Sequence, residues 1–345
     1  MQDPNLTPLS SLGEFGLIDR LTGAYKPSNP STLKGIGDDA AVLDYPDRKV
    51  LISTDLLIEG VHFDLTYYPL KHLGYKAVAV NLSDIYAMNG TPEQITVSLA
   101  ISSRFSLEAI EEIYSGIYLA CQTYGVDLVG GDTTSSRIGL VISVTVVGSA
   151  PAGEIVYRSG AKENDLVCVS GDLGAAYAGL LILEREKSVF KADPSMQPEL
   201  EGLDYLLQRQ LKPEPRADII NDLRKAGVQP TAMIDVSDGV ASDIRHIAKQ
   251  SGLGCVIFED KLPIFQTAYD QLAEMQIDPT TAALNGGEDY ELLFTISQAD
   301  YDKIKDHNDI SIIGYMTTRE EGYHLISKSG TKVELKAQGW DALKS

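Results

Sequence analysis

The sequence predicts an α+β protein made of two mixed α/β domains, the first with a mostly antiparallel sheet covered by helices. Its 345 residues exceed the size at which a single hydrophobic core usually stops growing. Long alternating strands in the first half favour an antiparallel or mixed sheet over the regular βαβ order of a doubly wound fold. A turn at Pro151-Ala152-Gly153 follows the last of these strands. We therefore expect an N-terminal domain of residues 1–150 and a C-terminal domain of residues 151–345.

The elements of the N-terminal half follow from the period of the apolar residues. Apolar residues at every second position from 95 to 101 are typical of a strand with one buried face. Behind Ser106, which can cap a helix, apolar residues recur at helical spacing as far as Tyr124. In chain order, we predict a helix over 12–21, strands over 40–43 and 49–53, a helix over 72–88, a strand over 95–101, a helix over 106–124, and strands over 128–129 and 140–147.

The C-terminal half continues the mixed α/β character. Residues 193–215 carry four prolines and few periodic apolar residues, so a loop or a short helix is expected there. Elsewhere we predict strands over 166–170, 232–234, 255–258 and 292–296, and helices over 175–184, 216–226, 242–250 and 268–275.

Charge and cysteine content limit the classes of partner and the compartment. The chain has 29 basic and 49 acidic residues and a net charge of −20, which repels nucleic acid and anionic membranes. The N-terminus lacks a basic region followed by an apolar one, and the apolar stretch 140–147 is too short to span a bilayer. Cys121, Cys168 and Cys255 have the spacing of neither a disulfide framework nor a metal site. We expect reduced core cysteines and a cytoplasmic protein without nucleic-acid or membrane partners.

Acidic residues recur in glycine-rich or polar turns beside apolar stretches. A single such aspartate usually serves local hydrogen bonding. Several together, without basic residues beside them, instead indicate a shared site for hard cations such as Mg²⁺, which is held by a few carboxylates plus substrate phosphates. The pattern therefore favours phosphate chemistry. The clusters are Gly35–Val42, Ser53–Asp55, Asn81–Asp84, Gly130–Thr133, Asp235–Gly239 and Gly286–Asp289.

Three of these carboxylates are predicted at strand ends. Asp55 follows the strand 49–53, Asp132 follows 128–129 through two glycines, and Asp235 follows 232–234. We expect each carboxylate at the C-terminal edge of its sheet, where ligand sites are common, with the glycines allowing close approach of a phosphate. The chain has no Walker-type Gly-x-x-x-x-Gly-Lys-Ser/Thr loop and no protein-kinase signature set, so any use of ATP requires another fold.

These clusters together resemble the thiamine-monophosphate kinase family. That family belongs to an ATP-binding superfamily with aminoimidazole ribonucleotide synthetase, selenophosphate synthetase and a hydrogenase maturation protein. The resemblance covers residues 35–295, and its most specific segments are Ser53–Phe63 and Gly286–Leu292. It implies an aminoimidazole ribonucleotide synthetase-like fold, a homodimer, and Mg²⁺- and ATP-dependent conversion of thiamine monophosphate to thiamine diphosphate, the last step of thiamine diphosphate biosynthesis. Two segments depart from the family pattern: Met88-Asn89-Gly90, where Met-Gly-Ala is usual, and Asp341-Ala342-Leu343 after Trp340, where His-Phe is often found.

By motif position, the resemblance implies roles for three sets of residues. Individual alternatives stay open: a solvated turn charge for Arg158, a structural role for His62, a core role for Tyr114, a solvated loop acid for Glu288 and a surface anchor for Trp340. Several Mg²⁺ ions would be held by Asp38, Ser53, Thr54, Asp55, Asp84, Asp132, Asp235 and Asp238. ATP would contact Tyr114, Gly131, Asp132, Arg158 and Ser237, and thiamine monophosphate would contact His62, Glu288 and Trp340.

The expected chemistry needs no general base. The acceptor is a phosphate monoester that is already ionised, and metal ions that neutralise charge supply most of the catalysis in phosphoryl transfer. No Ser–His or Cys–His pair with motif support occurs, so we expect direct transfer and no side chain acting as a nucleophile or general base.

Two alternative readings remain. The first is another enzyme of the superfamily. Selenophosphate synthetases use a reactive residue near the N-terminus, whereas the first cysteine here is Cys121 within a predicted helix, and Gly286–Leu292 argues against aminoimidazole ribonucleotide synthesis. The second is a non-catalytic divalent-cation-binding protein, whose loops should follow the Asp-x-Asp-x-Asp-Gly pattern, and no loop of this chain does.

Overall fold

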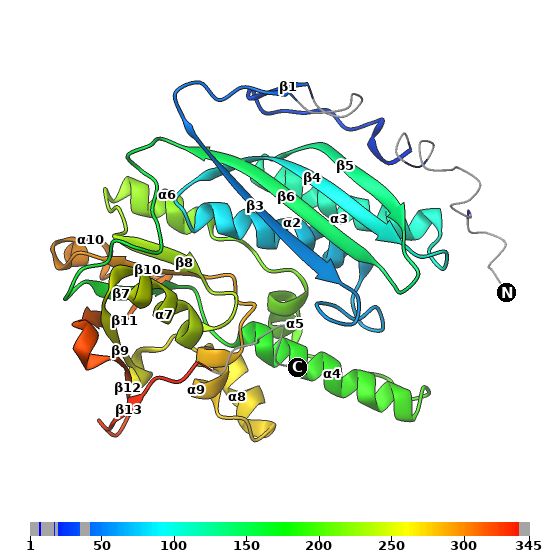
Figure 1. Ribbon diagram of the computed structural model, residues 1–345. Helices are drawn as coiled ribbons and strands as arrows, with labels where there is room; N and C mark the ends of the chain where they lie inside the picture. The colour runs from blue at the N-terminus through cyan, green and yellow to red at the C-terminus, as the bar shows by residue number, and fades with distance from the viewer. Residues whose placement is uncertain (1–6, 8–16, 18–19, 35–41, 338–345) are drawn as a thin grey trace. The chain divides into compact units, whose positions relative to one another are not determined.

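The computed structural model describes residue 7, residue 17, residues 20–34 and residues 42–337 (Figure 1). Within it the chain divides into two compact units, Met1–Ile85 with Gly90–Gly153, and Tyr86–Asn89 with Glu154–Ser345. Each unit has its own sheet and its own helices, which confirms the predicted α+β class. Asp38, Trp340 and most of the predicted helix 12–21 lie outside the described residues.

The first unit is built on a four-stranded sheet with the strand order β3-β6-β4-β5. Neighbouring strands are antiparallel except for β4 and β5, which are parallel. Helices α2 (Leu70–Tyr86) and α3 (Leu107–Tyr124) lie on one face of this sheet (Figure 1). The strands are β3 (Lys49–Ile58), β4 (Thr91–Ile101), β5 (Asp127–Ser135) and β6 (Val141–Ala150), and β1 (Thr32–Lys34) pairs separately with β2 (Val42–Leu43).

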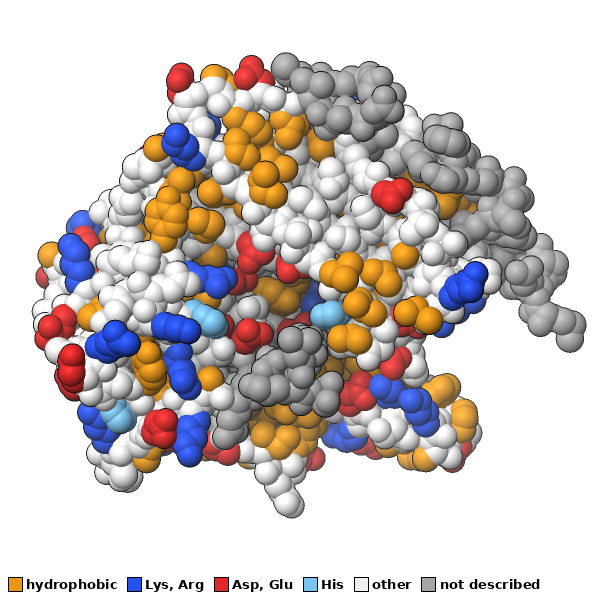
Figure 2. Space-filling model, viewed as in Figure 1, with side chains coloured by type: hydrophobic (Ala, Val, Ile, Leu, Met, Phe, Trp, Pro, Cys, Tyr) orange, Lys and Arg blue, Asp and Glu red, His pale blue; other side chains and the backbone are white. Residues whose placement is uncertain are grey.

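The two faces of this sheet differ in burial. Toward the helices, alternate residues such as Val97 and Val144 are at most 1% exposed. On the opposite face Val50, Ile52 and Leu56 of β3 are 46%, 69% and 49% exposed, and Figure 2 shows hydrophobic side chains at the surface over this sheet. The sheet therefore has one face packed in the core and one apolar face without cover among the described residues.

Helix α3 begins and ends as the sequence predicts. The Ser106 hydroxyl accepts a hydrogen bond from the backbone N–H of Ala109 at 3.4 Å, and Gly125 ends the helix in the left-handed conformation. The face that carries Ile110, Ile113 and Ile117 is fully buried. This agreement confirms the predicted cap and the predicted apolar face.

The second unit contains a seven-stranded sheet with the order β13-β12-β9-β11-β7-β10-β8. Its neighbouring strands are antiparallel except for the parallel pair β12 and β9. The strands are β7 (Leu166–Ser170), β8 (Ala232–Asp235), β9 (Gly254–Phe258), β10 (Leu292–Ile296), β11 (Ile310–Thr317), β12 (Tyr323–Ile326) and β13 (Lys332–Glu334). The first four of these were predicted, to within one residue, and the last three were not.

Helices cover the second sheet. The region 193–215, predicted as a loop or short helix, contains α5, and α9 was not predicted although Asp278 caps it and Pro279 begins it. The helices are α4 (Ala175–Ala192), α5 (Asp204–Leu211), α6 (Ala217–Lys225), α7 (Val240–Ser251), α8 (Gln266–Glu274), α9 (Pro279–Asn285) and α10 (Tyr301–Ile304).

The direction of three strands positions the polar residues of the second unit. Both β7 and β8 are antiparallel to β10, so the C-terminal ends of β7 and β8 meet the N-terminal end of β10 at one edge of the sheet. The segments that follow or precede these ends are 171–174, 236–239 and 286–291. Two of the acidic clusters found in the sequence therefore lie at this edge.

Candidate active site

In the first unit, three predicted metal ligands lie together between β3 and α2. The Ser53 hydroxyl donates to the Asp84 carboxylate at 2.5 Å, and the backbone N–H of Asp55 donates to the side chain of Asn81 at 2.9 Å. Burial, and then the negative charge of Asp84, raise the pKa of Asp55 to about 6. Two carboxylates that repel each other are stabilised by a cation between them. Together with the hydroxyl they supply the hard oxygen ligands that Mg²⁺ prefers.

The predicted strand ends at Asp55 and Asp132 are wrong. Strand β3 continues to Ile58 and β5 runs from Asp127 to Ser135, so both carboxylates lie within strands. The reason is pairing: β3 matches β6 along its whole length, from Lys49 to Ile58. In β3 this register turns Ser53 and Asp55 toward the helices. In the sequence, these polar residues after an apolar stretch had indicated the end of the strand.

The sheet separates Asp55 from Asp132 within one chain. Asp55 stands in one row with Val144, Val97 and Gly131, and β3 and β5 are the two edge strands. Three strand spacings place the two ends of this row about 14 Å apart. Asp132 is the next residue after Gly131, so its side chain points to the opposite face. One chain therefore does not bring both carboxylates to the same ion.

The other predicted residues of the first unit have local roles as well. A Cβ atom on Gly131 would lie 1.9 Å from the carbonyl oxygen of Val97, so only glycine fits between β5 and β4. The Thr54 hydroxyl donates to the Val144 carbonyl at 3.0 Å on the exposed face, and the His62 ring nitrogen Nδ1 accepts from the backbone N–H of Ile58 at 3.0 Å. Tyr114 is 7% exposed, and burial raises its pKa to about 12.

In the second unit, acidic residues surround the turn after β8. Asp235 ends the strand as predicted and is 4% exposed. Asp243 of α7 is 1% exposed, and the nearby backbone N–H groups of Asp238 and Gly239 partly oppose the rise of its pKa. Burial, and then the charges of Asp235 and Asp238, raise the pKa of Asp243 to about 8. Asp243 therefore lies within electrostatic reach of two predicted metal ligands, Asp235 and Asp238.

Sequence reasoning missed Asp243, although a signal was present. It lies at helical spacing with Val240, Ile244 and Ile247, all fully buried, so a charged residue stands on the buried face of α7. A charge on such a face is rarely tolerated without a specific role.

Arg158 lies within electrostatic reach of this turn. Burial raises the pKa of Asp238, and the charges of His246 and Arg158 oppose that rise. The pKa of His246 is lowered, first by burial and then by Arg158. The exposed Arg158 thus places a positive charge near Asp238, as a residue that contacts a nucleotide phosphate would.

The motif Gly286–Leu292 is hydrogen-bonded to the turn after β8. The backbone N–H of Glu288 donates to the Ser237 carbonyl at 2.8 Å, and that of Tyr290 donates to the Val236 carbonyl at 2.9 Å. Glu288 and Tyr290 have φ angles of 58° and 51°, which are uncommon for residues other than glycine and are found where surrounding structure enforces them. A predicted acceptor-binding residue and a predicted ATP-binding residue are therefore neighbours.

Within the part of the chain that the structure describes, no three His, Cys, Asp or Glu side chains lie close enough together to hold a metal ion by themselves. Mg²⁺ commonly takes one or two carboxylates and completes its shell with water and substrate phosphates. Small groups of acids such as Asp55 with Asp84 suit that mode of binding.

Comparison with known proteins identifies the family. The chain is 34% identical to the thiamine-monophosphate kinase of Bacillus subtilis over 342 residues, covering 96% of this chain and 100% of the relative. It is 37% identical to that of Aquifex aeolicus, with coverage of 96% and 98%. The chain belongs to the thiamine-monophosphate kinase family. Residues 37–150 also match the family described as AIR synthase related protein, N-terminal domain.

Solved structures agree with this assignment to the thiamine-monophosphate kinase family. The enzyme from Stenotrophomonas maltophilia superposes with a TM-score of 0.78 at 32% identity, covering 93% of this chain and 98% of that one. A structure described as AaThiL complexed with AMPPCP and TMP gives 0.74 at 34% identity, with coverage of 98% and 100%. The hydrogenase maturation protein HypE in complex with ATP gives 0.71 at 19% identity, with 92% of each chain covered, and shares the fold. These matches confirm the predicted aminoimidazole ribonucleotide synthetase-like fold.

Proposed function

We propose that this protein transfers the γ-phosphoryl group of ATP to thiamine monophosphate and produces thiamine diphosphate. The observation that carries the proposal is the pair of backbone hydrogen bonds between the Gly286–Leu292 motif and the turn after β8. They hold Glu288, assigned to the acceptor, next to Ser237, assigned to ATP. Family membership and a relative described with an ATP analogue and TMP support the same reaction.

The roles of the residues follow from their chemistry. Mg²⁺ would be held by carboxylates including Asp55, Asp84, Asp132, Asp235 and Asp238, and when bound it neutralises the phosphates. The acceptor phosphate is already a nucleophile, so no side chain has to remove a proton. Arg158, Gly131, Tyr114 and Ser237 would contact ATP.

The acceptor has two features that side chains can recognise. Glu288 would face the cationic thiazolium, and an aromatic side chain such as Trp340, the only tryptophan of the chain, would face a ring. His62 would contact the phosphate end. Adding thiamine monophosphate without ATP should change the Trp340 fluorescence, and unchanged emission would remove Trp340 from the acceptor site.

Coupled measurement of ADP release tests the reaction. ADP should form with thiamine monophosphate and Mg²⁺, and not with thiamine or without an acceptor. Asp55→Asn and Asp132→Asn should each lower kcat by about two or more orders of magnitude, because each removes a carboxylate that would hold the Mg²⁺ that neutralises the phosphates. Equal ADP release without an acceptor, or normal activity of both variants at limiting Mg²⁺, would contradict the proposal.

Direct transfer also has a stereochemical test. ATP made chiral at the γ-phosphorus with oxygen isotopes should yield thiamine diphosphate with inverted configuration, because one in-line step inverts phosphorus. The buried cysteines support direct transfer over a thiol intermediate, since burial raises the pKa of both Cys121 and Cys255 to about 12. Net retention would instead require a phosphoenzyme.

We also propose that the protein is a homodimer joined through the exposed face of the first sheet. Ile52 and Leu56 give this face the apolar character expected of an interface. Asp132 points to the same face, whereas Asp55 lies at the far edge of the sheet on the other face. Because Asp55 stands on the edge strand β3, a second copy that brings this edge over β5 would let Asp132 of one subunit serve a site that contains Asp55 of the other.

Subunit mixing tests this arrangement. Asp55→Asn and Asp132→Asn homodimers should each be inactive, whereas co-expression should produce mixed dimers with one intact site. Activity should recover to about a quarter of the wild-type value, the share of intact sites in a random mixture of subunits. No recovery in verified mixed dimers would place both residues in the site of one subunit.

The remaining expectations concern the surroundings of the enzyme. Three unpaired buried cysteines and a net charge of −20 support a cytoplasmic protein without nucleic-acid or membrane partners. None of the described helices is long and apolar enough to cross a bilayer.

A further inference from the structure

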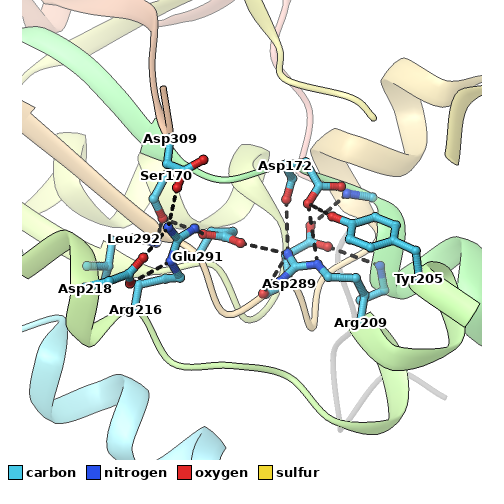
Figure 3. Close-up of polar contacts among 12 residues, drawn as sticks. Ser170, Asp172, Tyr205, Arg209, Arg216, Asp218, Asp289, Glu291, Leu292 and Asp309 are labelled. Carbon is cyan, nitrogen blue, oxygen red and sulfur yellow. Dashed lines mark hydrogen bonds and ion pairs between the residues drawn. The ribbon is translucent and has the colours of Figure 1, made fainter. Parts of the chain in front are cut away.

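The second unit contains a pocket that the proposed reaction does not use. It has a volume of about 560 Å³, within the range of small-molecule sites, and lies where β7 ends, beside α5 and the residues just before α8. Figure 3 shows the charged floor, formed by Arg209, Arg216 and Glu291. Tyr205 and Phe265 form an aromatic wall, with ring centroids 4.9 Å apart. Glu288 does not line it.

The arginines of the floor are already neutralised. Arg209 and Arg216 contact the two oxygens of Glu291 at 2.9 and 2.7 Å, and all three side chains are at most 12% exposed. Arg216 also binds Asp218 through two hydrogen bonds, of 3.0 and 2.8 Å. An anionic ligand would have to compete with these carboxylates, so the floor is not a phosphate site.

The rest of the lining favours a cation. Four acidic and three basic side chains line the pocket, and two of the basic ones are the neutralised arginines. Asp309 at the rim is 61% exposed and lies 3.6 Å from Arg216, and Asp172 lies 3.5 Å from Arg209. Four acids against three bases still leave the lining one excess negative charge. The buried Oδ2 of Asp172 has no hydrogen-bond donor among the described residues, and a ligand N–H would remove that cost. The exposed rings of Tyr205 and Phe265 add faces that attract cations.

The pocket is linked to the acceptor motif through consecutive residues of α5. Arg209 lines the pocket and donates to the carbonyl of Asp289 at 3.2 Å, while Gln210 donates to the Glu288 carboxylate at 2.8 Å. Glu291 of the floor belongs to the same short segment as Glu288. A ligand that shifts the floor therefore acts on the residue assigned to the acceptor.

We propose that this pocket binds a small heteroaromatic cation with N–H donors, of the size of thiamine, as an effector at a site separate from the acceptor site. Thiamine has the required groups: a thiazolium cation, an aromatic aminopyrimidine and an exocyclic amine. The aromatic wall holds the rings, and Asp172 and Asp309 hold the cation and the amine.

Calorimetric titration of thiamine into the full-length protein, without ATP, tests binding. Phe265→Ala should weaken the Kd by about tenfold, because it removes a cation-facing ring. Asp309→Asn, which changes charge without changing size, should weaken it severalfold. The matched controls are Tyr269→Ala, an exposed aromatic of α8 outside the pocket, and Asp302→Asn, an exposed acid of α10. Both controls should bind as wild type does, and Glu288→Gln should keep the part of the thiamine binding that depends on Phe265 and Asp309.

Three outcomes would overturn the proposal. The first is no thiamine binding by the wild-type protein at millimolar concentration. The second is binding that Glu288→Gln abolishes while Phe265→Ala and Asp309→Asn leave it unchanged, which would assign thiamine to the acceptor site alone. The third is displacement of thiamine by inorganic phosphate, which would make the pocket an anion site. Thiochrome, a neutral relative of thiamine, should bind more weakly than thiamine.

A kinetic experiment tests the effector role and rests on the proposed function. Thiamine should change the KM for thiamine monophosphate in the wild type in a saturable manner, and Phe265→Ala and Asp309→Asn should abolish that change. Simple competition that persists in both variants would overturn the effector role. Absence of kinase activity in a protein that still binds thiamine through Phe265 would refute the reaction and leave the pocket intact.

Discussion

Replacing Asp55 by asparagine should stabilise the protein when no metal is present. The substitution keeps the size of the side chain and removes the charge that faces Asp84, while the hydrogen bond to Asn81 uses the backbone N–H and persists. Without solvent screening, the rise of the Asp55 pKa to about 6 corresponds to a loss of about 3 kcal/mol in the free energy of unfolding when Asp55 is ionised. Because Asp55 is partly exposed, solvent screening reduces the expected gain to about 1–2 kcal/mol.

The gain should depend on pH and on Mg²⁺. Asp55 binds its proton more tightly in the folded than in the unfolded chain, so the wild type loses stability as pH rises from about 4 to about 6. The asparagine variant has no such loss, so its advantage is full above about pH 6 and absent below about pH 4. Saturating Mg²⁺ should reverse the order, since a cation that binds only the folded state adds about 2.7 kcal/mol at one hundred times its Kd.

Differential scanning calorimetry at about pH 8 measures both effects. In EDTA, Asp55→Asn should raise the Tm of the Mg²⁺-sensitive transition by about 3–6 °C, as expected for a unit of this size. The matched control is Asp44→Asn, an exposed acid before β3 that should change little. If Asp55→Asn lowers the Tm in EDTA, or if Mg²⁺ stabilises both proteins equally, Asp55 and Asp84 do not form a cation site.

Three further substitutions test the rest of the structure. Glu288→Gln should raise the KM for thiamine monophosphate and leave the KM for ATP nearly unchanged; an effect on ATP alone would move the acceptor site elsewhere. Asp243 contributes stability below about pH 4 that is lost as pH rises through its pKa of about 8, so Asp243→Asn should flatten the fall of Tm over this range, and an equally steep fall would contradict its burial as a strained acid. Ile52→Glu should convert a dimer into monomers in light scattering, because it places a charge on the exposed sheet face; an unchanged mass would exclude that face as the interface.

The parts of the fold that sequence reasoning found have strong local signals. Strands β7 and β10 were predicted with correct limits, because both are short apolar runs buried on both faces. Strands β12 and β13 carry half-buried or exposed residues, so apolar and polar residues do not alternate in a way that would predict a strand. In β3 the pairing with β6, over 80 residues away, decides where the strand ends, and no local pattern reports it.

The candidate site shows the same limit. The sequence marked Asp55, Asp84 and Asp235 as acids in short polar clusters, but only Asp235 lies at the end of a strand, because Asp55 is inside β3 and Asp84 is on α2. The contacts of Arg209 and Arg216 with Glu291 join α5 and the start of α6 to the start of β10, and nothing near either arginine in the sequence indicates its partner. Long-range ion pairs are therefore found from coordinates, whereas turn chemistry is found from sequence.

The strand order of the first unit has a consequence for how the chain folds. The parallel pair β4 and β5 is joined by α3, and β6 follows β5 directly, so these elements can assemble from one continuous stretch of chain. Within the sheet, strand β3 pairs only with β6, and this pairing closes a much longer loop, which costs more entropy and slows it. We therefore expect β3 to dock last. Ser53 and Asp55 would reach Asp84 only at the final step, so a nascent or partly folded chain would have the scaffold but no capacity to bind the metal.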